Sequence, residues 1–513
     1  MKNNFLKLTV LFCMMLGFWI KGQTGTRNVE RKGHSYYVDA TLGNDLNDGL
    51  SKKSAWKTIA RIQQTKLRPG DKVLLKRGEQ FEGTLDLTLQ GNSSRPIVIG
   101  AYGKDKKRPV VIAPDSSLFT IRILNSSYTT LRDLEIVNHG STDLASRTGV
   151  KVEAKDFGVS KCIHLHNLFI HDVNGSIQKW VGGGSGILLE NGGNKVVSTF
   201  DSLTIDYCHI QNCKRNGMIW NAYWERTNWH PNLNVRVRYN LIEEVPGDGI
   251  VPLGCDGAIV EYNVMRKSPD TMLRSNSEAA AGIWPWACDN TIIRYNESCD
   301  HKGPWDGQGF DADYDCTNTV IEYNYSHDNY GGMALMCTGA SSTKDVGNQA
   351  PILRYNLSIG DGNRPYPTRG SWFSPIIHVA GPIQNGQIYR NIIHNRIKAA
   401  EKIDRSMLTA TFWDGYAKNL LIKENIFYAP ESSGIDLGGI EKCTMDNNYY
   451  LGKIAASPDE KGSKQLDEEH IEMVKDASED GLLQLLDCVT IADGVQCRFV
   501  SKKKIEAFFN SIK

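Results

Sequence analysis

The 513-residue chain has no excess of charge of either sign. Its 59 Lys and Arg residues stand against 58 Asp and Glu residues, which leaves a formal net charge of +1. Nucleic-acid binding requires a basic stripe on the surface, so neither DNA nor RNA is an expected partner. The sequence also lacks a CxxC pair and any His/Cys spacing typical of zinc, so no zinc site is predicted from sequence motifs.

Long apolar runs are missing as well, with one exception near the N-terminus. The run from Leu8 to Ile20 follows Lys2 and Lys7 and is too short to span a bilayer. This pattern predicts a secretory signal over residues 1–23 and export to the periplasm or the medium, without a membrane span. In an exported protein, Cys488 and Cys497 are candidates for a disulfide.

A repeat dominates the rest of the sequence. Three segments align without gaps: CDGAIVEYN from Cys255, CDNTIIRYN from Cys288 and CTNTVIEYN from Cys316. Asparagine tolerates left-handed turns, and its amide can bond to the asparagine of the coil above and below. The aligned cysteines are expected to stack as small buried residues. The asparagine position is followed outward through Asn167, Asn240, Asn356, Asn391 and Asn425, with Asp133 and Cys208 in their own coils and Asn447 or Asn448 at the end.

Each repeat is rich in Val, Ile and Tyr, alternates with period two and is bounded by Gly, Asp and Asn. It therefore predicts short strands joined by turns at solenoid spacing. With these repeats the chain resembles the right-handed parallel β-helix proteins of the pectin-lyase-like superfamily, of the exported bacterial carbohydrate-active type. The resemblance implies an all-β solenoid. That superfamily includes lyases, hydrolases, epimerases and adhesins, so the fold does not decide the activity.

The predicted organisation has capping segments at both ends. Residues 24–118 form an N-terminal cap and first coils, 119–451 the β-helix, and 452–513 a C-terminal cap segment. We expect a helix from Ala55 to Thr65, a strand from Lys72 to Lys76, and an amphipathic helix within 501–513 that closes the open end of the solenoid. Five residues near the N-terminus could bind calcium or serve as plain turn residues: Asp39, Asn44, Asp45, Asn47 and Asp48.

One strand of each coil can be aligned by its leading glycine, at Gly149, Gly186, Gly217, Gly249, Gly282, Gly309 and Gly332. Alternation places the first and third residues after the glycine inside and the second and fourth outside. The outward residues of the last three coils are then Trp284 and Trp286, Asp311 and Asp313, and Ala334 and Met336. Because adjacent coils are about 4.8 Å apart, two indoles are predicted to lie beside two carboxylates on one solvent-facing wall.

This pattern predicts a sugar platform next to a catalytic pair, Asp311 and Asp313. Alternate residues of a strand lie about 6.5 Å apart, at the lower end of the carboxylate separation of inverting glycosidases. Mutual repulsion and desolvation would raise one pKa and so divide the roles of acid and base. The pair loosely resembles that of polygalacturonase-type hydrolases, which carry their aspartates on neighbouring coils. The expected activity is glycoside hydrolysis of a polysaccharide or oligosaccharide, with no cofactor required.

Further residues are expected to converge on this wall. Glu278 and Asp306 are the reserve acid and base. The tryptophans of long loops, Trp180, Trp224 and Trp229, are additional candidates for sugar stacking. The substrate-binding residues predicted in addition to Trp284 and Trp286 are Asp248, His301, Lys302, Trp305, His327 and His378.

Two other functions remain open. In a polysaccharide lyase, calcium would neutralise a uronate and Lys302, His301 or Arg274 would remove the proton. In a non-catalytic glycan-binding surface protein, the tryptophans alone would serve. The paired tryptophans and the absence of a basic outward ladder favour the hydrolase.

Overall fold

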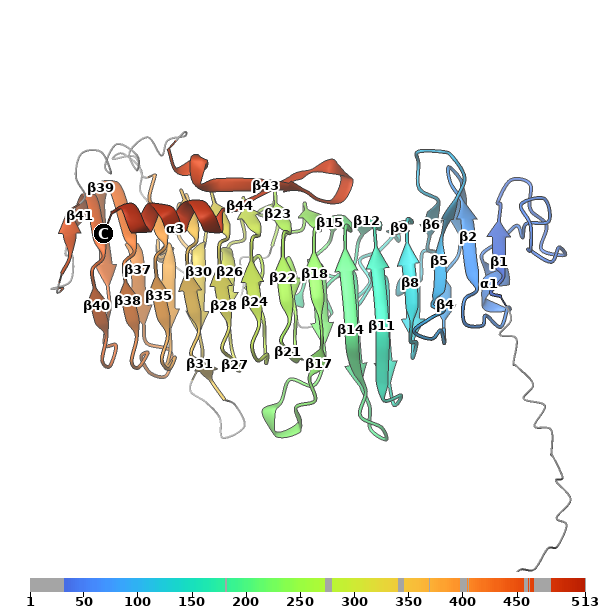
Figure 1. The fold of residues 1–513 in the computed structure, drawn as a ribbon, viewed down its shortest axis with the longest axis horizontal. Coiled ribbons are helices and arrows are strands. Elements are labelled where there is room, and N and C mark those ends of the chain that lie inside the picture. The colour runs from blue at the N-terminus through green and yellow to red at the C-terminus, as the bar shows by residue number, and fades with distance from the viewer. Residues whose placement is uncertain are drawn as a thin grey trace, which may run out of the picture. The chain divides into compact units, whose positions relative to one another are not determined.

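A computed structural model describes residues 32–179, 182–272, 279–339, 346–368, 370–396, 404, 406–455, 460, 462–465 and 481–512. From Gly33 onward the chain forms one compact unit. Its parallel strands stack coil upon coil along one axis (Figure 1). The predicted all-β parallel β-helix is therefore confirmed. Among the described residues, no helix is long and apolar enough to cross a membrane.

Each full coil contributes strands to three parallel sheets. The first sheet faces the viewer in Figure 1 and runs through almost the whole stack. Its members are β1 (Ser35–Val38), β2 (Lys72–Lys76), β5 (Ile97–Tyr102), β8 (Thr129–Arg132), β11 (Val159–His166), β14 (Thr199–Asp206), β18 (Arg236–Arg238), β22 (Ile259–Glu261), β24 (Ile292–Arg294), β28 (Val320–Glu322), β32 (Ile352–Arg354), β35 (Gln387–Tyr389), β38 (Leu421–Lys423) and β40 (Thr444–Asp446), with β17 (Asn232–Leu233) and β21 (Cys255–Asp256) as a side branch and β27 (Cys316–Thr317) and β31 (Asn348–Gln349) as a separate pair.

The second sheet carries the candidate active site on its outer face. Single bridges through Ile283 join its two halves, from Ile250 to Ile283 and from Ile283 to Phe310. Its strands are β4 (Leu85–Leu87), β7 (Phe119–Leu124), β10 (Thr148–Lys155), β13 (Ser185–Gly192), β16 (Asn216–Asn221) and β20 (Ile250–Val251), followed by β26 (Gln308–Ala312), β30 (Gly332–Cys337), β34 (Ile377–Ala380), β37 (Ser406–Thr411) and the end of β39 (Ile426–Asp436).

The third sheet lies under the C-terminal segment of the chain. Its strands are β3 (Gln80–Glu82), β6 (Val110–Ile112), β9 (Glu135–Asn138), β12 (Phe169–Val173), β15 (His209–Cys213), β19 (Leu241–Glu243), β23 (Val264–Arg266), β25 (Glu297–Cys299), β29 (Tyr325–His327), β33 (Leu357–Ile359), β36 (Ile392–His394), the start of β39, β41 (Tyr449–Ala455) and β42 (Lys464–Gln465). Short helical turns are α1 (Ala60–Gln63), η2 (Arg226–Asn228), η4 (Leu482–Leu485) and η5 (Ala492–Gly494). Helix α1 is thus shorter than predicted, whereas β2 has the predicted bounds.

The predicted ladder of buried asparagines forms from Asn240 onward, whereas two of the earlier members were assigned one residue too early. Each Asn amide from Asn240 to Asn425 bonds to the Oδ1 of the Asn in the following coil, and Asn448 ends the series on the Glu460 carboxylate. The left-handed residue is the one before the ladder position, such as Tyr239 or Asn447, so asparagine is needed here for hydrogen bonding rather than for its backbone. Asn167 and Asp133 occupy that left-handed position, so placing them in the ladder was wrong by one residue.

The leading glycines also form a ladder, which explains one error in the predicted alignment. A Cβ on Gly249 or Gly282 would lie 2.4 Å from the carbonyl oxygen of the next glycine along, Gly282 or Gly309. Gly332 does not continue this series, because it pairs with Gln308 rather than with Gly309. The prediction that Ala334 and Met336 face outward is therefore wrong: both lie in the hydrophobic core, and Leu335 and Cys337 take the outer positions.

The C-terminal segment folds back along the side of the solenoid. The antiparallel strands β43 (Leu486–Thr490) and β44 (Gln496–Val500) and the helix α3 (Lys502–Ser511) run along the upper edge of the stack in Figure 1. Phe499 packs edge-on against the stacked Tyr262 and Tyr295. The predicted amphipathic helix forms, but it covers the third sheet instead of closing the end.

The cysteines of the described chain are all free. Cys255, Cys288 and Cys316 are buried in the stack, as predicted. Cys488 is exposed, whereas Cys497 is buried and lies opposite Val489 in the hairpin. The disulfide between Cys488 and Cys497 is therefore contradicted, because their side chains lie in different environments.

Two of the N-terminal turn residues accept hydrogen bonds from backbone N–H groups. Asp39 accepts from those of Thr41 and Leu42, which is the turn role that the sequence offered as the alternative to calcium binding. Asp45 accepts from those of Lys57 and Thr58, farther along the chain.

Candidate active site

Two tryptophans and two aspartates share the outer face of the second sheet. The core takes Ile283, Phe310 and Ala312, so the alternate residues project outward. Two rows of outward side chains result from the strand register. One row is Val251, Trp284, Asp311, Leu335 and His378, and the other is Leu253, Trp286, Asp313, Cys337 and Ala380. The predicted juxtaposition of indoles and carboxylates is present in the structure.

The row that contains Asp311 is not open to solvent. Trp284 packs with Val251 and Ala281, and on the other side Leu335 packs with Cys337 and Trp413. Asp311 is only 2% exposed as a result, and the expectation that it faces solvent is wrong. Burial, followed by the nearby Asp313 and Asp306 carboxylates, raises the pKa of Asp311 well above its ordinary value. A carboxyl with this burial has no direct access to a sugar.

Asp313 lies at the edge of this covered region and is half-buried. Its Oδ1 accepts a hydrogen bond from the backbone N–H of Tyr314 at 2.6 Å and one from the Cys337 thiol at 3.0 Å. Burial outweighs these bonds, and together with the Asp306 carboxylate it raises the pKa of Asp313 to about 6. Asp313 can thus hold a proton under mildly acidic conditions, as a general acid must.

Asp306 occupies the turn that leads into β26, with a backbone φ of 52°. It is half-buried and lines a cavity next to Trp305 and Gln308. Its carbonyl oxygen accepts a hydrogen bond from Nη2 of Arg364 at 2.7 Å, which holds the turn in place. Asp306 is therefore the second half-buried carboxylate of the site, and its charge contributes to the raised pKa of Asp313.

Two hollows are lined by residues of the second sheet and its loops, one on the tryptophan coils and earlier coils and one on the aspartate and later coils. The first has a volume of about 660 Å³ and extends from Trp284 and Trp286 toward Lys179 and Glu190 on earlier coils. The second has a volume of about 390 Å³ and extends from Asp306 toward His378 and later coils. Its rim includes Trp305, Phe373 and Trp413. Each hollow has the size of a small-ligand site.

The two tryptophans have different roles. The Trp284 Nε1–H donates to Oδ1 of the buried Asp248 at 3.0 Å, and Lys179 lies over the Trp284 ring at 5.1 Å. Trp286 is half-buried and borders Trp224 and Tyr314, with ring centroids 6.2 and 6.4 Å away. Trp284 thus packs into the outer face of the second sheet and is held there by Asp248, whereas Trp286 presents aromatic surface to the first hollow.

Asp248 and His301 are structural residues. Asp248 is fully buried, and its Oδ2 lies 3.7 Å from the buried Arg215 and 3.9 Å from Lys179. His301 is fully buried as well: its Nδ1 accepts from the Gly303 N–H, and its Nε2 lies 3.1 Å from the Gly247 carbonyl. Burial lowers the pKa of His301 to about 4, so its ring is neutral. Their prediction as sugar-binding residues is therefore wrong.

The other predicted residues divide between the site and the rest of the fold. Trp305 and His378 line the second hollow, and His378 bonds to Oγ1 of Thr411 at 2.8 Å. Lys302 is directed to the Asp328 carbonyl oxygen at 2.7 Å. His327 belongs to the third sheet and contacts Glu297 and Arg498 under the C-terminal segment, so it is not part of the site. Glu278, Arg274 and Trp180 lie outside the described residues.

Sequence reasoning missed several residues that line the hollows. Arg364 and Phe373 lie on the long connection between β33 and β34, and Lys179 lies on the connection between β12 and β13. Glycine, proline and aromatic residues recur between Gly360 and Pro375, which is the kind of loop signal that identified the excursions around Trp180 and Trp224.

Comparison with known proteins agrees with this architecture. No protein-family model matches the sequence. A GH136 lacto-N-biosidase from Eubacterium ramulus superposes with a TM-score of 0.59 and 24% sequence identity, over 82% of this chain and 68% of that chain. A mannuronic acid specific polysaccharide family 6 lyase from human gut microbiota superposes with a TM-score of 0.50 and 16% identity, over 88% of this chain and 95% of that chain. The chain thus has the parallel β-helix fold of these structures.

One curated protein is similar to this chain in sequence. A lacto-N-biosidase from Bifidobacterium longum subsp. longum is 27% identical over 383 residues, which cover 56% of this chain and 24% of that protein. The chain thus spans about a quarter of the length of this curated relative.

Proposed function

We propose that this protein is a glycoside hydrolase in which Asp313 is the general acid and Asp306 the second catalytic carboxylate. The observation that carries the proposal is a half-buried carboxyl whose pKa is raised to about 6, in part by the charge of Asp306, a second half-buried carboxylate that lines the second hollow. Asp313 would protonate the glycosidic oxygen as the bond breaks. Asp306 would stabilise the developing oxocarbenium ion, as a nucleophile or as the base for water.

The relatives support an oligosaccharide as the substrate. The relative similar in sequence and a structural neighbour both carry the name lacto-N-biosidase, so glycans that end in lacto-N-biose belong in the first substrate panel. The hollows contain tryptophan surface, and two cations that line the first hollow are paired with acids. Arg122 and Lys151, on the first hollow, are paired with Asp86 and Glu190. A neutral sugar chain fits this lining better than a polyuronate does.

The test is a panel of oligosaccharides and polysaccharides that is assayed in parallel for new reducing ends and for absorbance of unsaturated uronate products. Reducing ends without that absorbance support the hydrolase. Unsaturated products would establish a lyase, and binding without turnover across the panel would favour a glycan-binding protein. Addition and removal of calcium in each assay tests whether the ion is needed for either activity.

We also propose that the protein is exported, since Lys2 and Lys7 precede the apolar run from Leu8 to Ile20. Fractionation of the producing cells with N-terminal sequencing of the mature chain tests this. A cytoplasmic chain that keeps Met1 would contradict it.

The proposed acid predicts the pH dependence of turnover. Because Asp313 must carry a proton, kcat/KM should be maximal below the Asp313 pKa of about 6 and fall about tenfold per pH unit above it. Initial rates over a pH series measure this fall in kcat/KM. An aryl glycoside with a good leaving group needs no protonation, so kcat/KM for that substrate should not fall over the same pH range. An equally steep fall for both substrates would contradict the role of Asp313.

The two tryptophans should respond differently to substitution. Trp286→Ala removes exposed stacking surface from the first hollow, and KM should rise about tenfold with little change in the melting temperature. Trp284→Ala removes a buried ring and leaves Asp248 without its indole partner, so it should destabilise the fold by about 3–5 kcal/mol. Kinetics and urea unfolding of both variants separate the roles. Equal effects of both substitutions on stability would contradict this division.

A further inference from the structure

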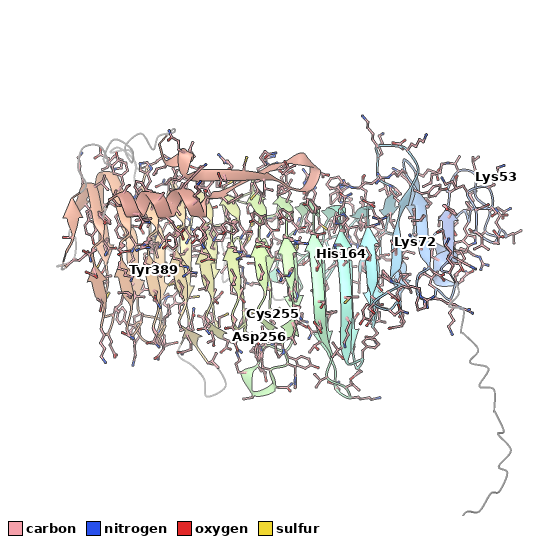
Figure 2. The ribbon with its side chains drawn as sticks, viewed as in Figure 1. Lys53, Lys72, His164, Cys255, Asp256 and Tyr389 are labelled. Carbon is pink, nitrogen blue, oxygen red and sulfur yellow. The ribbon has the colours of Figure 1, made fainter. Side chains whose placement is uncertain are left out.

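A cluster of metal-donor side chains lies on the outer face of the first sheet, on strands remote from the aspartates. His164 and His166 alternate along β11, whose Ile163 and Leu165 are buried in the core. Asp206 ends β14 in the next coil, directly opposite His166 in the register. His164 appears on the broad sheet that faces the viewer in Figure 2. All three side chains therefore share one face.

The ligand atoms already converge. Oδ1 of Asp206 lies 2.9 Å from Nε2 of His164 and 2.7 Å from Nδ1 of His166, and the three donor atoms lie within 4.8 Å of one another. A tetrahedral zinc ion with ligands at about 2.0–2.1 Å requires donor atoms roughly 3.3 Å apart. Each nitrogen would thus move by about half an ångström relative to the carboxylate. The imidazoles are about one third exposed and can rotate, whereas Asp206 is 6% exposed and fixed.

This cluster differs from two other histidine clusters in the described part of the chain in its ratio of imidazoles to carboxylates. His171 lies between Glu135 and Asp172, and His209 lies between Glu243 and Asp493. One imidazole between two carboxylates is an ion pair, and its acids raise the pKa of each of these histidines against the opposing effect of burial. At Asp206 two imidazoles meet one carboxylate oxygen, which is an excess of nitrogen donors over acids.

We propose that His164, His166 and Asp206 bind a divalent transition-metal ion of the zinc class. Two imidazoles and one carboxylate suit Zn²⁺, with Ni²⁺ and Cu²⁺ as alternatives, and they suit the oxygen-seeking Ca²⁺ and Mg²⁺ poorly. A solvent molecule would complete the coordination on the exposed side. The ion would tie two successive coils together, so its effect is on the stability of the solenoid, independently of the proposed glycosidase function.

Two arginines limit the affinity of the site. Nη2 of Arg238 lies 3.6 Å from the other oxygen of Asp206, and Arg132 flanks His166 in the register while its Nε lies 3.6 Å from Asp133. The remaining neighbours of His164 in the register, Thr130 and Thr204, are uncharged. A cation at Asp206 would be repelled by Arg238. Removal of the Arg238 charge should therefore tighten metal binding.

The test uses the full-length chain without a histidine tag, stripped with EDTA and titrated with ZnCl₂ near neutral pH. We expect one ion per chain by calorimetry and a melting temperature that rises with zinc concentration, because an ion that binds only the folded state stabilises it. His164→Gln and His166→Gln keep an amide donor to Asp206 and should weaken binding by at least about tenfold. Arg238→Gln should strengthen it, and the matched control His171→Gln should leave it unchanged.

Metal selectivity gives a second readout. Ca²⁺ and Mg²⁺ should give no rise in the melting temperature, because they prefer oxygen ligands. The proposal is overturned if zinc leaves the melting temperature unchanged, or if the rise persists in His164→Gln and His166→Gln, which would place the ion elsewhere.

Discussion

Replacement of Asp313 by Asn should reduce kcat by about 10²- to 10⁴-fold while KM changes little. The amide keeps the shape of the carboxyl but cannot donate a proton to the leaving oxygen. An aryl glycoside with a good leaving group should recover most of the lost rate, since it departs without protonation. Steady-state kinetics on both substrates measures this difference.

The matched control is Asp311→Asn on the same strand and the same outer face. Asp311 is buried and its pKa is raised well above the ordinary value, so burial favours its neutral form, which the amide resembles. We expect activity within about tenfold of the natural protein, because neither group reaches the sugar. A loss as large as that of Asp313→Asn would restore Asp311 to the catalytic pair and contradict the assignment.

Stability provides a check on the same variant. The pKa of Asp313 in the folded state lies above its ordinary value of 3.8, so the folded protein holds the proton more tightly than the unfolded chain. Stability contributed by this group is full below about pH 3.8 and is lost as pH rises toward about 6. Asp313→Asn should therefore be no less stable than the natural protein at neutral pH, and a misfolded variant would be recognised by its lower melting temperature.

Replacement of Asn324 by Ala should cost at least about 3 kcal/mol of unfolding free energy. Oδ1 of Asn324 accepts hydrogen bonds from the backbone N–H and from the side-chain Nδ2 of Asn296. Nδ2 of Asn324 donates to the carbonyl oxygen of Ile293 and to Oδ1 of Asn356, and all four distances lie between 2.9 and 3.1 Å. Alanine leaves these buried groups unpaired on both neighbouring coils. Urea unfolding followed by circular dichroism measures the loss.

The chain offers a solvent-exposed ladder for comparison. Nδ2 of Asn318 donates to Oδ1 of Asn290 at 3.1 Å, and Asn290 donates in turn to Asp256. Asn318 has a φ of 58°, so Asn318→Gly removes the hydrogen bond without straining the backbone. Water can replace this bond, and we expect a loss below about 1 kcal/mol. Similar losses for the two variants would contradict the role of burial in the asparagine ladder.

The sequence by itself was sufficient for the coil repeat. In a parallel stack, equivalent residues of successive coils meet the same environment, so a requirement at one position recurs in the sequence. This is why the ladder from Asn240 onward, the buried Cys255, Cys288 and Cys316, and the outward Trp284 and Asp311 could be predicted. The spacing in the sequence carries that information because the neighbours of each residue in the stack are the equivalent residues of the adjacent coils.

The chemistry of the site depended on contacts that no local pattern encodes. Asp311 is buried because it lies between Trp284 and Leu335 on the two adjacent coils. Leu335 takes this outward position because Gly332 pairs with Gln308, one residue before the glycine position of the preceding coil. The second hollow needs the loop that carries Arg364, and His327 is covered by a segment that returns from the far C-terminus. Exposure and pKa are properties of everything that surrounds a side chain. The sequence therefore determined which coils carry the acids, and only the tertiary structure decided which of these acids a sugar could reach.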